Sequence, residues 1–403
     1  MNLGLRLDVD GADLPDGCVA PDSRRDLVVL VRHIAAHFAS LAGRPVPFPG
    51  FSLGQELALT QRKVVLLLID GLGDDDLCHR EPAGFLRSQR RARLSSVFPS
   101  TTASAVASLM SGLAPAQHGL TGWFIRERRM GGVLAPLMMQ SRGGGPLKAI
   151  GAARRLFPYR TLYQQLAAPS TVVAPWDILD SPFNRRHSRG AGRIGYRRLE
   201  DLSGAVLRAV AGHTAGGFVY AYYPRYDGVC HRYGVASDEA RQEFARIDAM
   251  VQALAATLTP HGVDLVVSAD HGFGDVPTER THEIDDWPEV AAFLAAPLGG
   301  ERRMAWCAVR PGTSAAFLAA ITRRLGSTGR VVPSGNLAAA GFLGSGPVHR
   351  RLGERIGDYA IVMAPGWALR DRVAGEVEHP MIGLHGGLSA AEMGIPLIHV
   401  ACH

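Results

Sequence analysis

The chain has 403 residues, of which 47% are hydrophobic and 20% charged, and this composition excludes a chain that is mainly disordered. The formal net charge is +6, from 43 cationic and 37 anionic residues. No dense run of Lys and Arg with interleaved aromatic residues occurs, which argues against nucleic-acid binding as the main function.

The five cysteines are scattered and contain no C-x-x-C pair, which argues against a disulfide framework and against a cysteine zinc site. No segment approaches 18 uninterrupted apolar residues, and the first residues lack the pattern of a signal peptide. We therefore expect a cytoplasmic protein that binds neither a membrane nor nucleic acid.

The first clear strand covers residues 64–69, and we expect residues 1–59 to pack on the core that begins there. This all-apolar run, VVLLLI, is typical of a strand buried on both faces. Asp70 and Gly71 follow it directly. The acidic run 74–76 comes next and is more simply explained as solvated surface.

A second strand-like run at residues 94–98 leads into a helix of small residues at 103–110. Thr101 and Thr102 lie at the start of this helix. A hydroxyl residue at that place is commonly an N-cap. Alternatively, the helix N-terminus and a neighbouring cation favour an alkoxide there, which would make the threonine a nucleophile.

The region from residue 124 to 198 is rich in Gly, Pro and Arg, and we expect long loops over the core. Further strands are predicted at 218–223, 263–267 and 395–400, and the apolar periodicity predicts a helix at 237–258. Alternating strands and helices predict an α/β fold with a mostly parallel sheet between helices.

The core covers about residues 60–275 and 381–403. Between these two segments the strand and helix patterns restart. We therefore expect a small inserted α/β lobe at about 277–380 within one catalytic domain of residues 1–403.

Several polar residues follow these strands closely. Asp227 and His231 are four residues apart, so a helical turn would bring them to one face. Asp270 and His271 follow the strand at 263–267, at the end where ligands bind in open α/β sheets, and His385 precedes the next helix and the final strand.

Three aspartates, three histidines and a hydroxyl at a helix start are enough to hold two divalent cations. Mixed imidazole and carboxylate ligands suit Zn²⁺ first, with Mn²⁺ as the alternative. Two such cations can clamp the attacking and leaving oxygens of a displacement at phosphorus.

Five motifs carry a family resemblance: LLLIDGLG, FPSTTASAVASLMSGLAPAQHGLTGW, YYPRYDGVCHRYG, VVSADHGFGD and MIGLHGG. In this order and spacing the chain resembles the alkaline phosphatase superfamily, and most closely its nucleotide pyrophosphatase/phosphodiesterase (type I phosphodiesterase) branch. The resemblance covers about residues 60–275 and 380–400, and it implies an alkaline-phosphatase-like core.

The resemblance also implies a ligand set. Asp227, His231 and His385 would hold one zinc ion. The second would be held by Asp70, Asp270 and His271, with Thr102 as nucleophile bridging toward it. Thr102 is favoured over Thr101 because of its position relative to the proline of the motif.

Ala105, three residues after Thr102, offers no side-chain donor to the phosphate oxygens, so another group must supply one. The candidates to supply a donor are the Thr102 backbone N–H, Ser104, Arg225 and the arginines at 185–186. Trp123, Tyr159, Trp176 and Phe183 could stack against a ring of the substrate, although aromatic residues in loops more often pack.

These observations predict a metal-dependent phosphodiesterase or nucleotide pyrophosphatase with a covalent phospho-threonine intermediate. Its partner would be a small phosphorylated substrate, such as a nucleotide. The alternative on the same scaffold is a phosphomonoesterase or phosphonate hydrolase. The alternative hypothesis outside the enzymes is a binding protein without catalytic activity.

Overall fold

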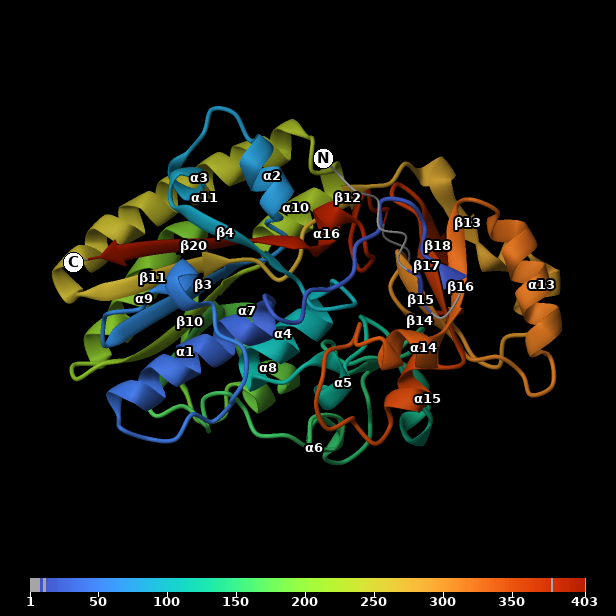
Figure 1. The fold of residues 1–403 in the computed structure, drawn as a ribbon, viewed down its shortest axis with the longest axis horizontal. Helices are drawn as coiled ribbons and strands as arrows, with labels where there is room; N and C mark the ends of the chain where they lie inside the picture. Colours follow the sequence, from blue (N-terminus) through green and yellow to red (C-terminus); the bar gives the residue numbers. More distant parts are fainter. Residues whose placement is uncertain (1–7, 10–11, 378–379, 403) are drawn as a thin grey trace.

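A seven-stranded sheet forms the centre of the larger lobe (Figure 1), in a computed structural model that describes residues 8–9, 12–377 and 380–402. The strand order is β4-β20-β11-β3-β10-β8-β9. β11, β3, β10, β8 and β9 run parallel to one another, and β20 lies antiparallel between β11 and β4. The strands are β3 (Lys63–Ile69), β4 (Arg90–Ser95), β8 (Ser170–Pro175), β9 (Gly192–Tyr196), β10 (Gly217–Tyr223), β11 (Val263–Ser268) and β20 (Gly394–Cys402). This arrangement confirms the predicted α/β fold with its mostly parallel sheet.

The middle strand, β3, is flanked on both sides and is buried from Val64 onward. Its apolar side chains therefore pack against helices on both faces, as expected of a parallel strand. In the register, Ile69 lies opposite Tyr223 of β10, and Leu68 lies opposite Ser268 of β11. The carboxyl ends of the three strands consequently meet at one edge of the sheet.

Helices cover both faces of the sheet (Figure 1). On one face lies the long helix α11 (Asp238–Leu258), against which α9 (Leu199–Gly212) and α10 (Arg225–Tyr233) pack. On the other face lie α1 (Leu27–Leu41) and α4 (Thr102–Ser111). The predicted helix at 237–258 corresponds to α11, whose N-cap Ser237 accepts a hydrogen bond from the backbone N–H of Ala240.

The remaining helices are short. They are α2 (Asp74–His79), α3 (Phe85–Ser88), α5 (Pro115–His118), α6 (Ala152–Leu156), α7 (Trp176–Leu179), α8 (Pro182–His187), α12 (Pro288–Ala291), α14 (Ser334–Ala339), α15 (Leu352–Ile356) and α16 (Ala390–Met393). No helix in the described ranges is long and apolar enough to cross a lipid bilayer.

The prediction of long loops from residue 124 to 198 was wrong. This region supplies β8 and β9 of the central sheet, and a small antiparallel sheet of β5 (Ile125–Glu127), β6 (Gly132–Ala135) and β7 (Gln140–Ser141). β8 is buried along its whole length, because it lies between β10 and β9. Neighbouring Gly, Pro and Arg residues hid this short strand in the sequence.

The acidic run at 74–76 was also assigned wrongly to the solvated surface. The side chain of Asp74 is buried, and the Arg90 guanidinium donates to its carboxylate at 2.9 Å. Asp76 accepts hydrogen bonds from Tyr226 and Arg80. Both aspartates thus help to fix α2 on the core.

A second, four-stranded sheet lies beside the central one in the order β14-β15-β17-β16 (Figure 1). All its neighbouring strands are antiparallel, and α13 (Ser314–Leu325) packs on it. The strands are β14 (Gly299–Gly300), β15 (Met304–Cys307), β16 (Gly329–Pro333) and β17 (Tyr359–Met363). This sheet and its helices form what we call the inserted lobe.

Six short strands, in three pairs, complete the fold. β12 (Gly274–Asp275) pairs with β19 (Gly383–Leu384), β13 (Thr281–Glu283) pairs with β18 (Ala368–Arg370), and β1 (Asp8–Val9) pairs with β2 (Ala12–Asp13). The first two pairings connect residues about a hundred positions apart in the chain and bring together the two ends of the insertion.

Candidate active site

Three of the predicted ligands stand at the carboxyl ends of β3 and β11. Asp70 follows β3, and Asp270 and His271 follow β11. The backbone N–H groups of Gly71 and His271 donate to Asp270 Oδ1 at 3.0 and 3.1 Å. Gly71 has a φ of +78°, and a Cβ on it would lie 2.4 Å from the Phe273 ring, so this close turn requires glycine.

Two further residues come from one face of α10. Asp227 and His231 are one helical turn apart, and His231 Nε2 lies 3.4 Å from Asp227 Oδ1. His385 reaches the same place from the segment after β19, which the β12–β19 pairing holds beside the loop that carries Asp270 and His271. Segments distant in sequence therefore converge as predicted.

Thr102 is the first residue of α4 and reaches this cluster from the opposite side. Its Oγ1 lies 3.4 Å from Asp70 Oδ1 and 3.2 Å from His271 Nε2. Thr101 is the N-cap, but its side chain makes no capping hydrogen bond and is fully buried. The first N–H groups of α4 have no partner within the helix, so they add a partial positive charge beside Thr102.

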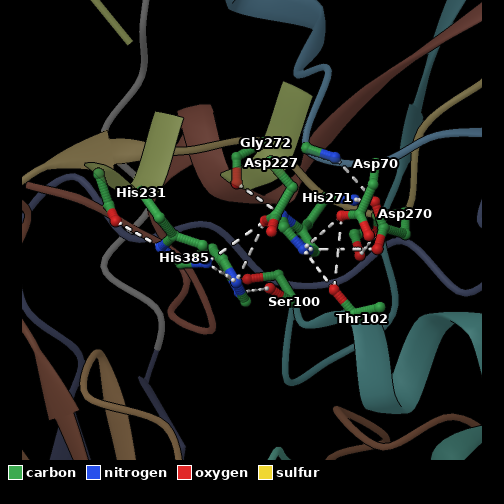
Figure 2. A network of polar contacts seen from close by, with 12 residues as sticks. Asp70, Ser100, Thr102, Asp227, His231, Asp270, His271, Gly272 and His385 are labelled. Carbon is green, nitrogen blue, oxygen red and sulfur yellow. Dashed lines mark hydrogen bonds and ion pairs between the residues drawn. The ribbon is translucent and has the colours of Figure 1, made fainter. Parts of the chain in front are cut away.

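The seven predicted residues form one connected network (Figure 2). At one end, His271 Nε2 lies 3.5 Å from Asp70 Oδ1 and 3.4 Å from Asp270 Oδ2. At the other end, His385 Nε2 lies 3.2 Å from His231 Nε2 and 3.8 Å from Asp227 Oδ1. Between the ends the rings of His271 and His385 stack with centroids 3.7 Å apart.

The three imidazoles are oriented by backbone carbonyls. His231 Nδ1 faces the carbonyl of Gly383 at 2.8 Å, His271 Nδ1 that of Gly272 at 3.0 Å, and His385 Nδ1 that of Ser100 at 3.1 Å. A carbonyl only accepts, so each Nδ1 carries the proton. In the neutral imidazoles each Nε2 lone pair is therefore directed into the cluster, which is the arrangement found for metal-binding histidines.

The cluster fits divalent cations on two further grounds. Asp227 Oδ1 and Asp270 Oδ2 are buried and have no hydrogen-bond partner among the described residues, and each lies beside an imidazole. Two Nε2 lone pairs 3.2 Å apart and several buried carboxylates repel one another unless a cation lies between them. Among the described residues, two groups of three have ligand atoms within 4.8 Å of one another: Asp70, Asp270 and His271, and Asp227, His271 and His385. The second group contains His271 where the resemblance implied His231.

Burial and crowding shift the protonation of these groups. Burial, followed by the charges of Asp270 and Asp227, raises the pKa of Asp70. Burial also raises the pKa of Asp227 to about 7 and lowers the pKa of His385, to which the neighbouring imidazoles of His271 and His231 contribute. Bound cations would reverse these directions for the carboxylates, because they favour the ionised form.

A cavity of about 360 Å³ opens beside the cluster. Thr102, Asp227, His231 and His385 form its floor. Its walls come from residues 123–124 and 142 and from the inserted lobe at 298–302 and 369–377. Thr101 does not line it, which favours Thr102 as the residue that meets a substrate.

The side-chain candidates for phosphate binding do not reach this cavity. Ser104 is buried and donates to the carbonyl of Leu120 at 3.0 Å. Arg225 points outward, with its side chain 64% exposed, and faces Glu243 at 3.5 Å. Both were predicted from closeness in sequence to Thr102 or Asp227, but the helical turn directs each away.

Of the four aromatic candidates, only Trp123 lines the cavity. Tyr159 and Phe183 pack with Phe157, and Trp176 is exposed on the surface. The sequence reasoning missed Glu301 and Arg302, which line the cavity from the inserted lobe. No local pattern marks them, because their position depends on how the lobe packs on the core.

Comparisons with known proteins agree with this geometry. The family model described as type I phosphodiesterase / nucleotide pyrophosphatase matches residues 64–388. No curated protein matched the sequence.

Among solved structures, murine ectonucleotide pyrophosphatase/phosphodiesterase 5 is similar with a TM-score of 0.64 and 17% identity, over 84% of this chain and 87% of the other. The human protein of the same name gives a TM-score of 0.64 and 18% identity over the same shares of the two chains. Phosphonoacetate hydrolase from Sinorhizobium meliloti 1021, in complex with phosphonoacetate, gives a TM-score of 0.60 and 17% identity, over 84% of this chain and 90% of the other. At these identities the likeness shows a common fold.

Proposed function

The chain belongs to the type I phosphodiesterase / nucleotide pyrophosphatase family, and from that premise we propose that it cleaves phosphodiester or pyrophosphate bonds with Thr102 as the nucleophile. Membership makes it a hydrolase of phosphoester or anhydride bonds. The observation that carries the finer proposal is the position of Thr102, which starts α4, lines the cavity and lies within 3.4 Å of both Asp70 and His271.

Thr102 would attack phosphorus in line with the departing oxygen, forming a covalent phospho-threonine and releasing the alcohol or phosphate leaving group. Asp70 Oδ1 accepts the hydrogen bond of the Thr102 hydroxyl and so directs the Oγ1 lone pairs toward the cavity. Water then cleaves the phospho-threonine and regenerates the hydroxyl. A murine relative in which a threonine is replaced by alanine is described as inactive and in complex with AMP, which supports this role.

Asp70, Asp270 and His271 would hold one divalent cation, and Asp227, His231 and His385 the other. When bound, the two ions stabilise the threonine alkoxide and the charge on the departing oxygen. Zn²⁺ is our first choice for this mixed nitrogen and oxygen ligand set, and Mn²⁺ the second. His271 is near enough to both groups to position them relative to each other.

The N-terminus of α4 would receive the phosphoryl oxygens. Because Ala105 and Ser104 offer no side-chain donor toward the cavity, the unpaired backbone N–H groups at the start of this ten-residue helix take that role. The cavity then accepts the rest of a small phosphorylated substrate, with the Trp123 ring on one wall.

The test compares the hydrolysis of bis-p-nitrophenyl phosphate and p-nitrophenyl phosphate by the zinc-loaded protein. We expect a clear preference for the diester, and a loss of at least about 10³-fold in kcat for Thr102→Ala. Thr102→Ser keeps a hydroxyl and should retain far more activity than the alanine variant.

More than a few per cent of the activity in Thr102→Ala would overturn the nucleophile assignment. A preference for the monoester would reassign the protein to the phosphomonoesterases on this scaffold. Activity on neither ester would favour a binding protein without catalysis.

A further inference from the structure

A tight turn of the inserted lobe reaches the edge of the active-site cavity. Residues 301–303 connect β14 to β15, and the backbones of Glu301 and Met304 hydrogen-bond to each other across the turn. The carbonyl of Arg302 accepts from the N–H of Leu369 at 2.8 Å, and that of Arg303 from the N–H of Met363 at 3.1 Å. The backbone is therefore held firmly, so the three consecutive charged side chains have fixed starting points.

Two of these three side chains have partners within the protein. Glu301 accepts a hydrogen bond from the backbone N–H of Trp123 at 2.6 Å. Arg303 is buried and pairs with Glu392 through both ends of its guanidinium, at 3.1 and 2.9 Å. Arg302 lies between them, half-buried on the cavity wall, and within the described part of the chain its guanidinium has neither a hydrogen bond nor an ion pair.

The acidic residues around Arg302 are held by other cations. Glu376 faces Arg142 at 3.0 Å, and Glu283 pairs with Arg370 and lies 3.5 Å from Arg372. A half-buried guanidinium without a partner is costly, because it loses hydration without gaining hydrogen bonds. A ligand that enters the cavity can supply the missing acceptor.

We propose that Arg302 binds a second anionic group of the substrate while the phosphoryl group reacts at Thr102. The proposal rests on the proposed function, because it places the reacting phosphoryl group over Thr102 at the floor of the same cavity. A planar guanidinium matches the two oxygens of a carboxylate or of a phosphoryl group. The substrate class is thus a phosphate or phosphonate ester that carries a further carboxylate or phosphoryl group.

The cavity walls agree with a short, partly apolar body between the two anionic groups. Trp123, Phe124, Leu298 and Leu369 line the cavity together with Arg302. Apolar walls lower the local dielectric constant, which strengthens the attraction of a guanidinium in such a cavity for an anion.

The experiment uses three mono-p-nitrophenyl esters that differ only in the second group: those of ethylphosphonate, phosphonoacetate and methylenediphosphonate. For the zinc-loaded wild-type protein we expect kcat/KM to be about 10- to 100-fold higher for at least one doubly anionic ester than for the ethyl ester. Comparing kcat/KM of the phosphonoacetate and methylenediphosphonate esters shows whether Arg302 prefers a carboxylate or a phosphoryl group.

In Arg302→Gln this preference ratio should fall to within about 3-fold of unity, and Arg302→Lys should retain part of it. Arg372→Gln is the matched control, because Arg372 also lines the cavity but is half-exposed and faces Glu283 and Asp286. It should keep the wild-type ratio. Calorimetric titration with the same three esters compares Thr102→Ala with the double variant Thr102→Ala, Arg302→Gln. It measures the preference for a second anionic group as a difference in binding affinity.

Equal rates on all three esters, or a preference that survives in Arg302→Gln, would overturn the role of Arg302 while leaving the proposed function intact. Absence of turnover on every ester, in wild type as in Thr102→Ala, would instead contradict the proposed function. In that case the titration still decides whether Arg302 selects doubly anionic ligands.

Discussion

Asp26 shows how a single residue can both start a helix and make its stability depend on pH. Its side chain accepts a hydrogen bond from the backbone N–H of Val29 at 2.9 Å and so caps α1. The residue is buried, and this burial raises its pKa to about 7, against the opposing effects of the cap hydrogen bond and of Arg32. The folded state therefore holds the proton more tightly than the unfolded state does.

Because the pKa of Asp26 is raised in the folded state, its contribution to the free energy of unfolding is full below about pH 4. This contribution is lost as the pH rises toward 7. Asp26→Asn keeps a capping oxygen but has no charge to bury. We expect its free energy of unfolding, relative to wild type, to increase by a few kcal/mol between about pH 4 and 8. Denaturant unfolding at a series of pH values measures this difference.

Asp22→Asn is the matched control for this experiment, because Asp22 is exposed and close to the same helix start. It should change stability by less than about 0.5 kcal/mol at every pH. A pH-independent difference for Asp26→Asn would show that the carboxyl stays ionised in the folded protein.

At the scale of elements, α16 and the β14–β15 turn are joined by the buried Arg303–Glu392 pair. Burial opposes ionisation of Glu392, but Arg303 and the hydrogen bonds from Ser389 and Gly387 hold its pKa below the usual range. Arg303 also donates to the carbonyl of Ala364 at 2.7 Å. The pair thus connects the inserted lobe to the segment that follows His385.

We expect Arg303→Ala to destabilise the protein by about 3–5 kcal/mol, because it leaves the Glu392 carboxylate buried without its partner. The comparison variant is Arg324→Ala, which removes an exposed pair with Glu289 and should cost less than about 1 kcal/mol. Chemical denaturation of both variants gives the two values. Similar losses would mean that the buried pair has no special structural role.

The sequence predicted those elements whose signal is local. A continuous apolar run identifies β3, and a capped 3.6-residue periodicity identifies α11. β8 and β9 were missed because short strands between turn-forming residues are recognised only by their pairing with β10 and with each other. Pairing between distant segments leaves no mark in a single sequence.

The same distinction holds for the candidate site. Asp70, Asp270 and Thr102 lie beside a strand end or a helix start, and the family motifs found there implied their roles. Arg302 was not predicted, since its place at the cavity depends on the packing of the inserted lobe on the core. Ser104 was predicted wrongly, because closeness in sequence does not fix the direction of a side chain on a helix.

At the scale of the whole molecule, the ligand cluster joins β3, β11, α10, α4 and the segment after β19. Cations bound there would hold the core together, so ligand binding is also a contribution to folding stability. Zn²⁺ at about 100 times its dissociation constant should add about 2.7 kcal/mol, which is about 3 °C in Tm for a chain of this length.

Thermal unfolding with added Zn²⁺ and after treatment with a chelator tests this prediction. His271→Ala removes an imidazole whose ligand atom lies within 4.8 Å of those of Asp70 and Asp270 and also of those of Asp227 and His385, so its Tm should respond less to zinc. An unchanged Tm of the wild-type protein in both conditions would argue against tight cation binding by the folded state.

The antiparallel strand β20 gives the protein a particular order of assembly during translation. β20 lies between β4 and β11, although its residues 394–402 are synthesised about 300 positions after β4 and about 130 after β11. While the ribosome makes the inserted lobe, β11 has an open edge and β4 has no neighbour in the sheet. We therefore expect the nascent chain to expose strand edges that are prone to aggregation until β20 emerges and fills the gap.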